Sequence, residues 1–144
     1  MIGVSFDKMK SMFFDRAKVK GAVDRAARKV LSKFGAFVRQ TAKGSIRKRQ
    51  KPSQPGTPPS SHTGLLKRLI FFGFDPAKKS VVIGPAPLRA AVEAPPLLEY
   101  GGRARRKNRK GKLVSANYKA RAFMAPAFEK EKSKLPTLWA NSVK

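Results

Sequence analysis

A long amphipathic segment dominates the hydrophobic pattern of the chain. Between residues 16 and 49, apolar or small residues recur every three or four positions, which is the spacing of one face of an α-helix. The stripe consists of Val19, Val23, Ala26 or Ala27, Val30, Phe34, Phe37 or Val38, Thr41 and Ser45. The pattern predicts one helix of about eight turns, roughly 45–50 Å long at ~1.5 Å per residue. Such a helix cannot bury its own stripe, so other segments or a neighbouring subunit must cover it.

Two segments on either side of this helix differ from it in composition. Residues 1–15 hold an apolar cluster, an N-terminal arm that is expected to pack against the long helix or a neighbour. Residues 50–63 contain four prolines, which exclude helix interiors and central strands, so this segment is predicted to be an extended proline-rich loop. At its end, Thr63 is placed to cap a short helix that begins near Leu65.

The middle of the chain has the features of strands and turns. Residues 69–74 and 80–84 are predicted to form an antiparallel hairpin, joined by a turn that Asp75 opens. Residues 103–112 carry seven cations in ten positions and no acid, so they are interpreted as a basic loop. Residues 113–118 return from the tip of this loop as a strand.

Prolines mark the starts of two further helices, since proline is tolerated in the first helical turn. One helix is expected to begin at Pro95 or Pro96 and to end at the glycine pair 101–102. The last helix is expected to begin at Pro126 and to kink or restart at Pro136. Two acidic residues are expected near its positive end: Glu129 and Glu131.

The order of these elements predicts the α+β class, with one domain over residues 1–144. A long N-terminal helix would pack on a small antiparallel sheet, and a C-terminal helix would close the core.

Composition narrows the function classes. The chain has 33 Lys and Arg against 8 Asp and Glu, a formal charge of +25. Because so large a charge is costly through self-repulsion, a polyanion or an acidic protein surface is expected nearby. The chain has no cysteine, which excludes disulfides and thiolate metal sites. It lacks a secretory signal and an apolar run of transmembrane length, so we expect a soluble protein made in the cytoplasm, with no membrane partner.

Candidate catalytic groups are few. His62 is the only histidine, and nothing in the spacing brings Glu93 or Glu99 to it for acid–base catalysis, so an ordinary loop residue is the simpler interpretation. The carboxylates are scattered and do not form the cluster that a divalent metal needs. The sequence therefore predicts no catalytic residue, no metal and no cofactor. An enzyme is the least favoured class, represented by a small basic toxin or ribonuclease that would use His62.

Basic residues are the other candidates for a site: Arg47, Lys48, Arg49, Lys51, Arg103, Arg105, Arg106, Arg109 and Lys110. They could neutralise phosphates or contact an acidic partner, and a solvated surface is the alternative for both groups. Neither group interleaves aromatic residues with its cations, so a base-stacking platform is not indicated.

Four motifs follow one another from residue 56 onward: GTPPSSHTGLLKRLI, a hairpin ending VVIGP, PPLLEYGGRA, and YKARAFMAPAFEKE. Their order resembles the tail-completion, or head–tail joining (neck), proteins of long-tailed bacteriophages. That family has a long basic N-terminal helix, a TG-L helix start, a strand ending GP, an LEYG or LEFG turn, and an RPFM-PAL start of the closing helix. The matching residues are Thr63, Gly64, Leu65, Gly84, Pro85, Leu98, Glu99, Tyr100, Gly101, Arg121, Phe123, Met124, Pro126 and Ala127. The chain departs from the pattern at Gly102, at Ala122 and in a longer proline-rich segment.

The motif residues also have a physical interpretation of their own. Glu99 and Arg121 could form an ion pair that fixes the turn to the last helix. Gly101 permits a backbone angle that other residues resist. Three large side chains would fill the core between the long helix and the sheet: Phe123, Met124 and Phe128.

The resemblance implies a non-enzymatic structural protein of the virion, located in the neck and assembled in the host cytoplasm. By resemblance it forms a ring, expected to be a hexamer, between the connector on the portal side and the tail tube or terminator protein. A ring needs heterologous interfaces that close. The cations would face acidic neighbouring rings or the packaged DNA in the lumen. The alternative is a free nucleic-acid-binding protein of the ribosomal or nucleoid type.

Overall fold

The computed structural model describes residues 16–86, 94–140 and 142, so the predicted arm over residues 1–15 lies outside the described residues. The described elements, in chain order, are α2 (Arg16–Ser45), β1 (Arg47–Lys48), β2 (Ser60–Ser61), α3 (Leu65–Arg68), β3 (Ile70–Asp75), β4 (Ser80–Pro85), α4 (Ala94–Tyr100), β5 (Gly102–Lys107), β6 (Leu113–Tyr118), α5 (Met124–Lys132) and α6 (Leu135–Trp139). The α+β prediction is confirmed: a long N-terminal helix, small antiparallel sheets and C-terminal helices.

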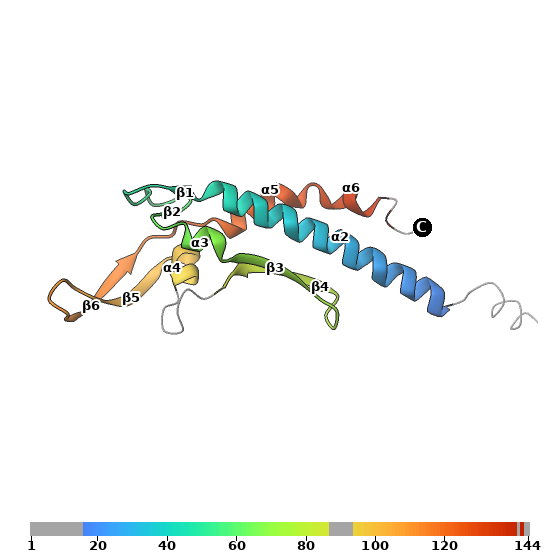
Figure 1. Ribbon diagram of the computed structural model, residues 1–144, viewed down its shortest axis with the longest axis horizontal. Helices are drawn as coiled ribbons and strands as arrows, with labels where there is room; N and C mark the ends of the chain where they lie inside the picture. The colour runs from blue at the N-terminus through green and yellow to red at the C-terminus, as the bar shows by residue number, and fades with distance from the viewer. Residues whose placement is uncertain (1–15, 87–93, 141, 143–144) are drawn as a thin grey trace, which may run out of the picture.

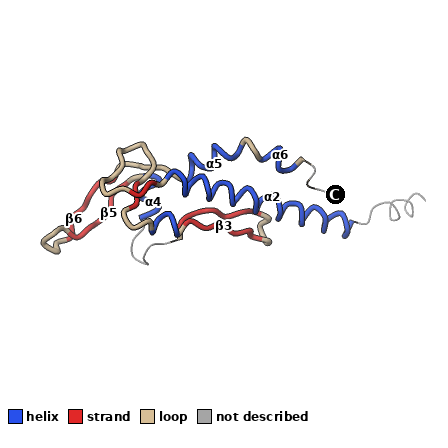
Figure 2. The backbone as a smooth tube through the Cα atoms, turned by 45° about the horizontal axis from the view of Figure 1, so that its top comes forward, coloured by secondary structure: helices blue, strands red, loops and turns tan. Residues whose placement is uncertain are grey.

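Helix α2 runs along most of an elongated molecule and separates two layers. The β3–β4 hairpin lies along one side of α2, and α5 and α6 lie along the other (Figure 1); the rotated view agrees (Figure 2). Between these layers lies the hydrophobic core, composed of Phe34, Val38, Ala42, Ile46, Leu66, Ile70, Phe123 and Ala127. From α2 the core takes Phe34, Val38 and Ala42, which recur every four residues as one stripe.

The helix ends four residues earlier than predicted, at Ser45 rather than Arg49. Gly44 has low helix propensity, and the Ser45 hydroxyl donates to the Ala42 carbonyl oxygen at 2.8 Å. Ile46 is 1% exposed and enters the core, after which β1 pairs in parallel with β2. Burial of Ile46 and the pairing of β1 with β2 together stabilise the chain more than a further turn of helix would.

The predicted stripe holds for the middle of α2 and fails at its N-terminal end. Ala26, Val30, Phe34 and Val38 are buried, whereas Val19 and Val23 are 51% and 45% exposed. The helix extends beyond the β3–β4 hairpin at this end (Figure 1). In the last turns, the buried position is Ala42, because the predicted stripe residue Thr41 turns its hydroxyl toward α5, as described below.

The first antiparallel hairpin matches its prediction to within one residue. Strands β3 and β4 pair from Ile70 with Pro85 to Asp75 with Ser80. The Asp75 carboxylate accepts hydrogen bonds from the backbone N–H groups of Ala77 and Lys78 at 2.9 and 3.2 Å, which closes the turn. The hairpin thereby presents alternate side chains to α2.

The second hairpin corrects the prediction of a basic loop over residues 103–112. Residues 102–107 are strand β5, paired along its whole length with the predicted strand β6. Only residues 108–112 form the turn, in which the Asn108 side chain accepts hydrogen bonds from two backbone N–H groups. A charge run does not prevent strand formation here, because β6 supplies the hydrogen-bonding partners and long arginine side chains remain in water.

The helix starts of the second half differ in detail from the predictions. Gly64, in the left-handed conformation, caps α3 without a side-chain cap, and the Thr63 hydroxyl accepts from the Leu65 N–H at 3.3 Å. Helix α4 begins at Ala94, one residue before the first candidate proline, and ends before the glycine pair 101–102, as predicted. Helix α5 begins two residues before Pro126, and the chain restarts as α6 with Pro136 in its first turn, as predicted.

Glu99 holds α4 against the start of α5. Its carboxylate accepts hydrogen bonds from the backbone N–H groups of Phe123, Met124 and Ala125 at 3.0, 3.1 and 2.8 Å. These are the otherwise unpaired donors of a helix N-terminus, and a negative charge is favourable there. The expected pair with Arg121 is therefore wrong, since Glu99 is occupied by backbone donors.

Arg121 instead joins the last helix region to the proline-rich loop. Its Nε donates to the Ser53 carbonyl oxygen at 3.0 Å. Gly101, between α4 and β5, has φ +74°, as predicted for its turn. A side chain there would lie 2.8 Å from the Tyr118 carbonyl oxygen, so both conformation and space require glycine.

The acidic residues of α5 lie toward its C-terminal end, not at its positive end as predicted, because the helix starts earlier. Glu131 is 2% exposed. It accepts hydrogen bonds from the Thr41 hydroxyl at 2.7 Å and from the Lys134 ammonium at 2.5 Å. These bonds join α5 to α2 and to the start of α6.

The three side chains predicted to fill the core differ in their burial. Phe123 is buried, Met124 is half-buried against the core, and Phe128 is 39% exposed. Phe128 still contacts Phe34 edge to face, with ring centroids 5.6 Å apart.

Candidate anion-binding hollow and basic ribbon

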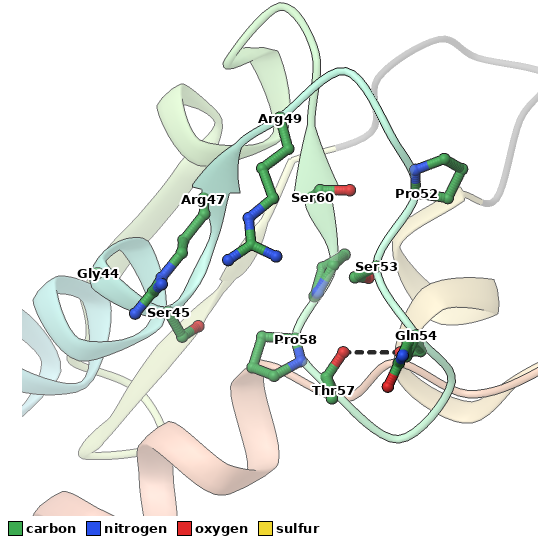
Figure 3. A pocket seen from close by; sticks show the side chains of 11 residues that line it. Gly44, Ser45, Arg47, Arg49, Pro52, Ser53, Gln54, Thr57, Pro58 and Ser60 are labelled. Carbon is green, nitrogen blue, oxygen red and sulfur yellow. Dashed lines mark hydrogen bonds between the residues drawn. The ribbon is translucent and has the colours of Figure 1, made fainter.

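The structure gathers two of the predicted basic residues around a hollow of about 620 Å³. Arg47 and Arg49 stand two residues apart in extended chain, so their side chains extend from the same side of the backbone. In Figure 3 the Arg49 guanidinium lies between the strand and the facing loop, and the Arg47 guanidinium lies on the side of Gly44 and Ser45. The hollow is lined by Gly44, Ser45, Arg47, Arg49, Pro52, Ser53, Gln54, Thr57, Pro58, Pro59 and Ser60.

The far wall of the hollow is the proline-rich loop, which hydrogen bonds hold in place. The Ser60 hydroxyl donates to the Lys51 carbonyl oxygen at 2.9 Å, and the Thr57 hydroxyl donates to the Gln54 carbonyl oxygen at 2.7 Å. The Gly56 N–H donates to the Ala120 carbonyl oxygen at 3.0 Å, which ties the loop tip to the chain leaving β6. Together with the hydrogen bond from Arg121 to Ser53, these bonds hold the loop in one position.

The electrostatics of this end favour an anion. None of the described lining residues is acidic, and within the described chain no carboxylate forms an ion pair with Arg47 or Arg49. Nearby on α2, burial lowers the pKa of Lys43, and the charges of Arg39 and Lys67 lower it further. Cations are therefore crowded around the C-terminal end of α2.

The second group of predicted residues forms a basic ribbon, which we define as β5, β6 and their turn. Alternation places Arg103, Arg105 and Lys107 on one face. Their cross-strand partners are Asn117, Ser115 and Leu113. Arg106 lies on the other face. The ribbon projects from the end of the molecule that also carries the hollow (Figures 1 and 2).

The remaining predicted site residues lie on the surface around these two features. Lys48 and Lys51 are exposed beside the hollow without lining it, and Arg109 and Lys110 are exposed in the ribbon turn. His62 is exposed in the loop before α3. Among the described residues, no group of three or more His, Cys, Asp or Glu could hold a metal ion.

Sequence reasoning missed the polar residues of the loop wall, namely Ser53, Gln54 and Thr57, and the ribbon cation Lys107. The loop residues carry no motif, because their position depends on bonds to distant segments such as Ala120 and Arg121. Lys107 could have been found by the two-residue spacing from Arg103 and Arg105, had the segment been assigned as a strand.

No protein-family model, curated protein or solved structure matches the chain. Within the described residues, none of the helices combines the length and apolar character needed to cross a membrane.

Proposed function

We propose that this protein is a structural component of a phage virion that joins the head to the tail as a ring in the neck. The ring would lie between the connector on the portal side and the tail tube or terminator protein. The order of the four sequence motifs suggests this role, and the surface of the protomer supports it.

The observation that carries the proposal is an apolar surface that the protomer leaves uncovered. On the face of the β3–β4 hairpin that points away from α2, Phe71 is 51% exposed and Val82 is 65% exposed. The first turns of α2 add Val19 and Val23. Exposed apolar side chains grouped in this way mark candidate interaction sites. A ring protomer needs two different surfaces of this kind, one for each neighbour.

The motif residues have defined structural roles, which supports the resemblance independently of the family name. Gly64 caps α3, Gly84 and Pro85 end β4, and Gly101 makes the turn after α4. Glu99 holds the start of α5 through three hydrogen bonds. The third and fourth of these motifs therefore depend on each other in space, as parts of one folding unit.

A phage that encodes this chain provides the direct test. With the gene inactivated, electron microscopy of lysates is expected to show filled heads and complete tails that are not joined. The purified chain added to such a lysate is expected to restore joined particles. Normal particles without the polypeptide would refute the proposal.

The basic ribbon favours a second candidate, a free nucleic-acid-binding protein. A two-stranded β-ribbon fits the major groove of a duplex, and one face carries Arg103, Arg105 and Lys107. This candidate predicts that the isolated chain binds duplex DNA with a steep salt dependence. Replacement of these three cations by glutamine should then weaken binding more than the same replacement of Arg25, Arg28 and Lys29 on the exposed face of α2.

A further inference from the structure

The hollow between β1 and the proline-rich loop has the properties of a preformed site for oxyanions. Arg47 of β1 and Arg49, directly after the strand, line one wall, and the opposite wall is held by hydrogen bonds. Guanidinium forks bind carboxylates and phosphates through paired N–H donors. A volume of about 620 Å³ lies within the usual range for ligand sites.

We propose that this hollow binds carboxylate side chains of an acidic segment of a partner protein, with Arg47 and Arg49 as the anchoring residues. The inference rests on the proposed function only for the identity of the protein that supplies the acidic segment. The binding chemistry itself belongs to the isolated chain and can be tested on it.

The lining favours a peptide over a nucleic acid. It contains no aromatic side chain on which a base could stack. Instead, Pro52, Pro58 and Pro59 provide rigid apolar surface beside the two arginines. A hollow of about 620 Å³ can take one or two extended residues of a peptide, whereas a duplex could offer it only a backbone phosphate. Polar loop groups such as Gln54 and Thr57 can bond a peptide backbone.

The test measures binding of a hexaglutamate peptide to the full chain by calorimetry at about physiological salt, where non-specific attraction is screened. We expect Arg47→Gln with Arg49→Gln to weaken the dissociation constant roughly tenfold or more. The matched control is Arg105→Gln with Arg109→Gln, which removes the same charge from the ribbon. We expect it to change binding less than about twofold. Circular dichroism verifies that both variants fold.

Each alternative has a distinct result. Equal weakening in both variants would show that net charge alone attracts the peptide, and would overturn the proposal. If inorganic phosphate competes with the peptide at equal concentration and shifts the Arg47 and Arg49 Nε–Hε signals in NMR, the hollow is a phosphate site. If a short DNA duplex gives the same two effects, the hollow is a nucleic-acid site. Either result would overturn the peptide assignment. Loss of head–tail joining is measured separately in the phage, so failure of one proposal does not imply failure of the other.

Discussion

Single residues decide how the C-terminal helices attach to the rest of the molecule. Glu99 comes from α4 yet satisfies three backbone donors at the start of α5. Glu131 comes from α5 yet bonds Thr41 on α2. In both cases a buried carboxylate bridges two elements in addition to their hydrophobic contacts, and its loss leaves hydrogen-bond donors unpaired.

Replacement of Glu99 by glutamine is expected to lower the free energy of unfolding by about 1–2 kcal/mol, because the neutral amide offers one acceptor and no charge to the helix start. Denaturant titration measures the change. The control is Glu129→Gln, whose partner Lys132 lies 3.6 Å away on the exposed surface and which should cost less than about 0.5 kcal/mol. Equal effects of the two substitutions would show that Glu99 is not a structural cap.

Glu131 is expected to make stability depend on acid. The hydrogen bond from Lys134 lowers its pKa below the ordinary value of 4.5, and the bond from Thr41 lowers it further. As the pH falls, the Glu131 carboxylate is therefore protonated in the unfolded chain before it is protonated in the folded protein. The contribution to stability is fully present above about pH 4.5 and is lost as the pH falls through the native pKa. Unfolding free energies from about pH 7 to pH 3 should fall less steeply in Glu131→Gln; parallel curves would contradict this assignment.

At the level of elements, the contact between α2 and the β3–β4 hairpin is closest at Gly35. A side chain at Gly35 would lie 2.7 Å from Val81 Cγ2 and 2.9 Å from Phe72 Cδ2. These distances are shorter than atomic contact allows, so the hairpin would have to move away from the helix. The absence of a side chain at this position is what lets two elements pack so closely.

Gly35→Ala is expected to destabilise the fold by roughly 1–3 kcal/mol despite the better helix propensity of alanine, because overpacking outweighs that gain. Gly44→Ala is a matched control in the same helix, where nothing lies within 4 Å of the added carbon. It should be neutral or stabilise by up to about 1 kcal/mol. Thermal melts of the two variants that shift in the same direction would refute the close contact.

At the scale of the whole molecule, the uncovered apolar face of the first hairpin and the hollow around Arg47 and Arg49 lie apart. Phe71 and Val82 are exposed on the outer face of the first hairpin, whereas the hollow and the ribbon lie toward the C-terminal end of α2 (Figure 1). This separation suits a subunit that contacts copies of itself through one region and an acidic partner through the other.

Val82→Arg is expected to prevent ring formation without unfolding the protomer, because Val82 is 65% exposed and contributes little to the core. The control Ala77→Arg adds the same charge to the exposed turn of the same hairpin. Light scattering of the chain mixed with the proposed connector and tail-tube partners measures assembly. Rings that form normally with Val82→Arg would exclude this face from the interface.

The sequence by itself determined the elements whose signals are local. Period-3.6 spacing from Ala26 to Val38 fixed the buried part of α2, because each side chain there depends on its helical neighbours. Turn chemistry at Asp75 fixed the first hairpin, and Gly101 marked a turn that only glycine tolerates. The strength of the positive charge, and hence the expectation of an acidic or anionic partner, also followed from composition alone.

Only the tertiary structure decided which residues meet across the chain. It showed the basic segment after Gly102 to be a strand, because pairing depends on β6 and not on the charge of β5. In the structure Glu99 accepts from backbone N–H groups and Arg121 donates to Ser53, whereas their opposite charges had suggested that they pair with each other. The hollow around Arg47 and Arg49 likewise exists because the helix ends at Ser45 and the loop is held by distant bonds. Long-range packing and hydrogen bonding carry no period in sequence, so these arrangements could not be read from it.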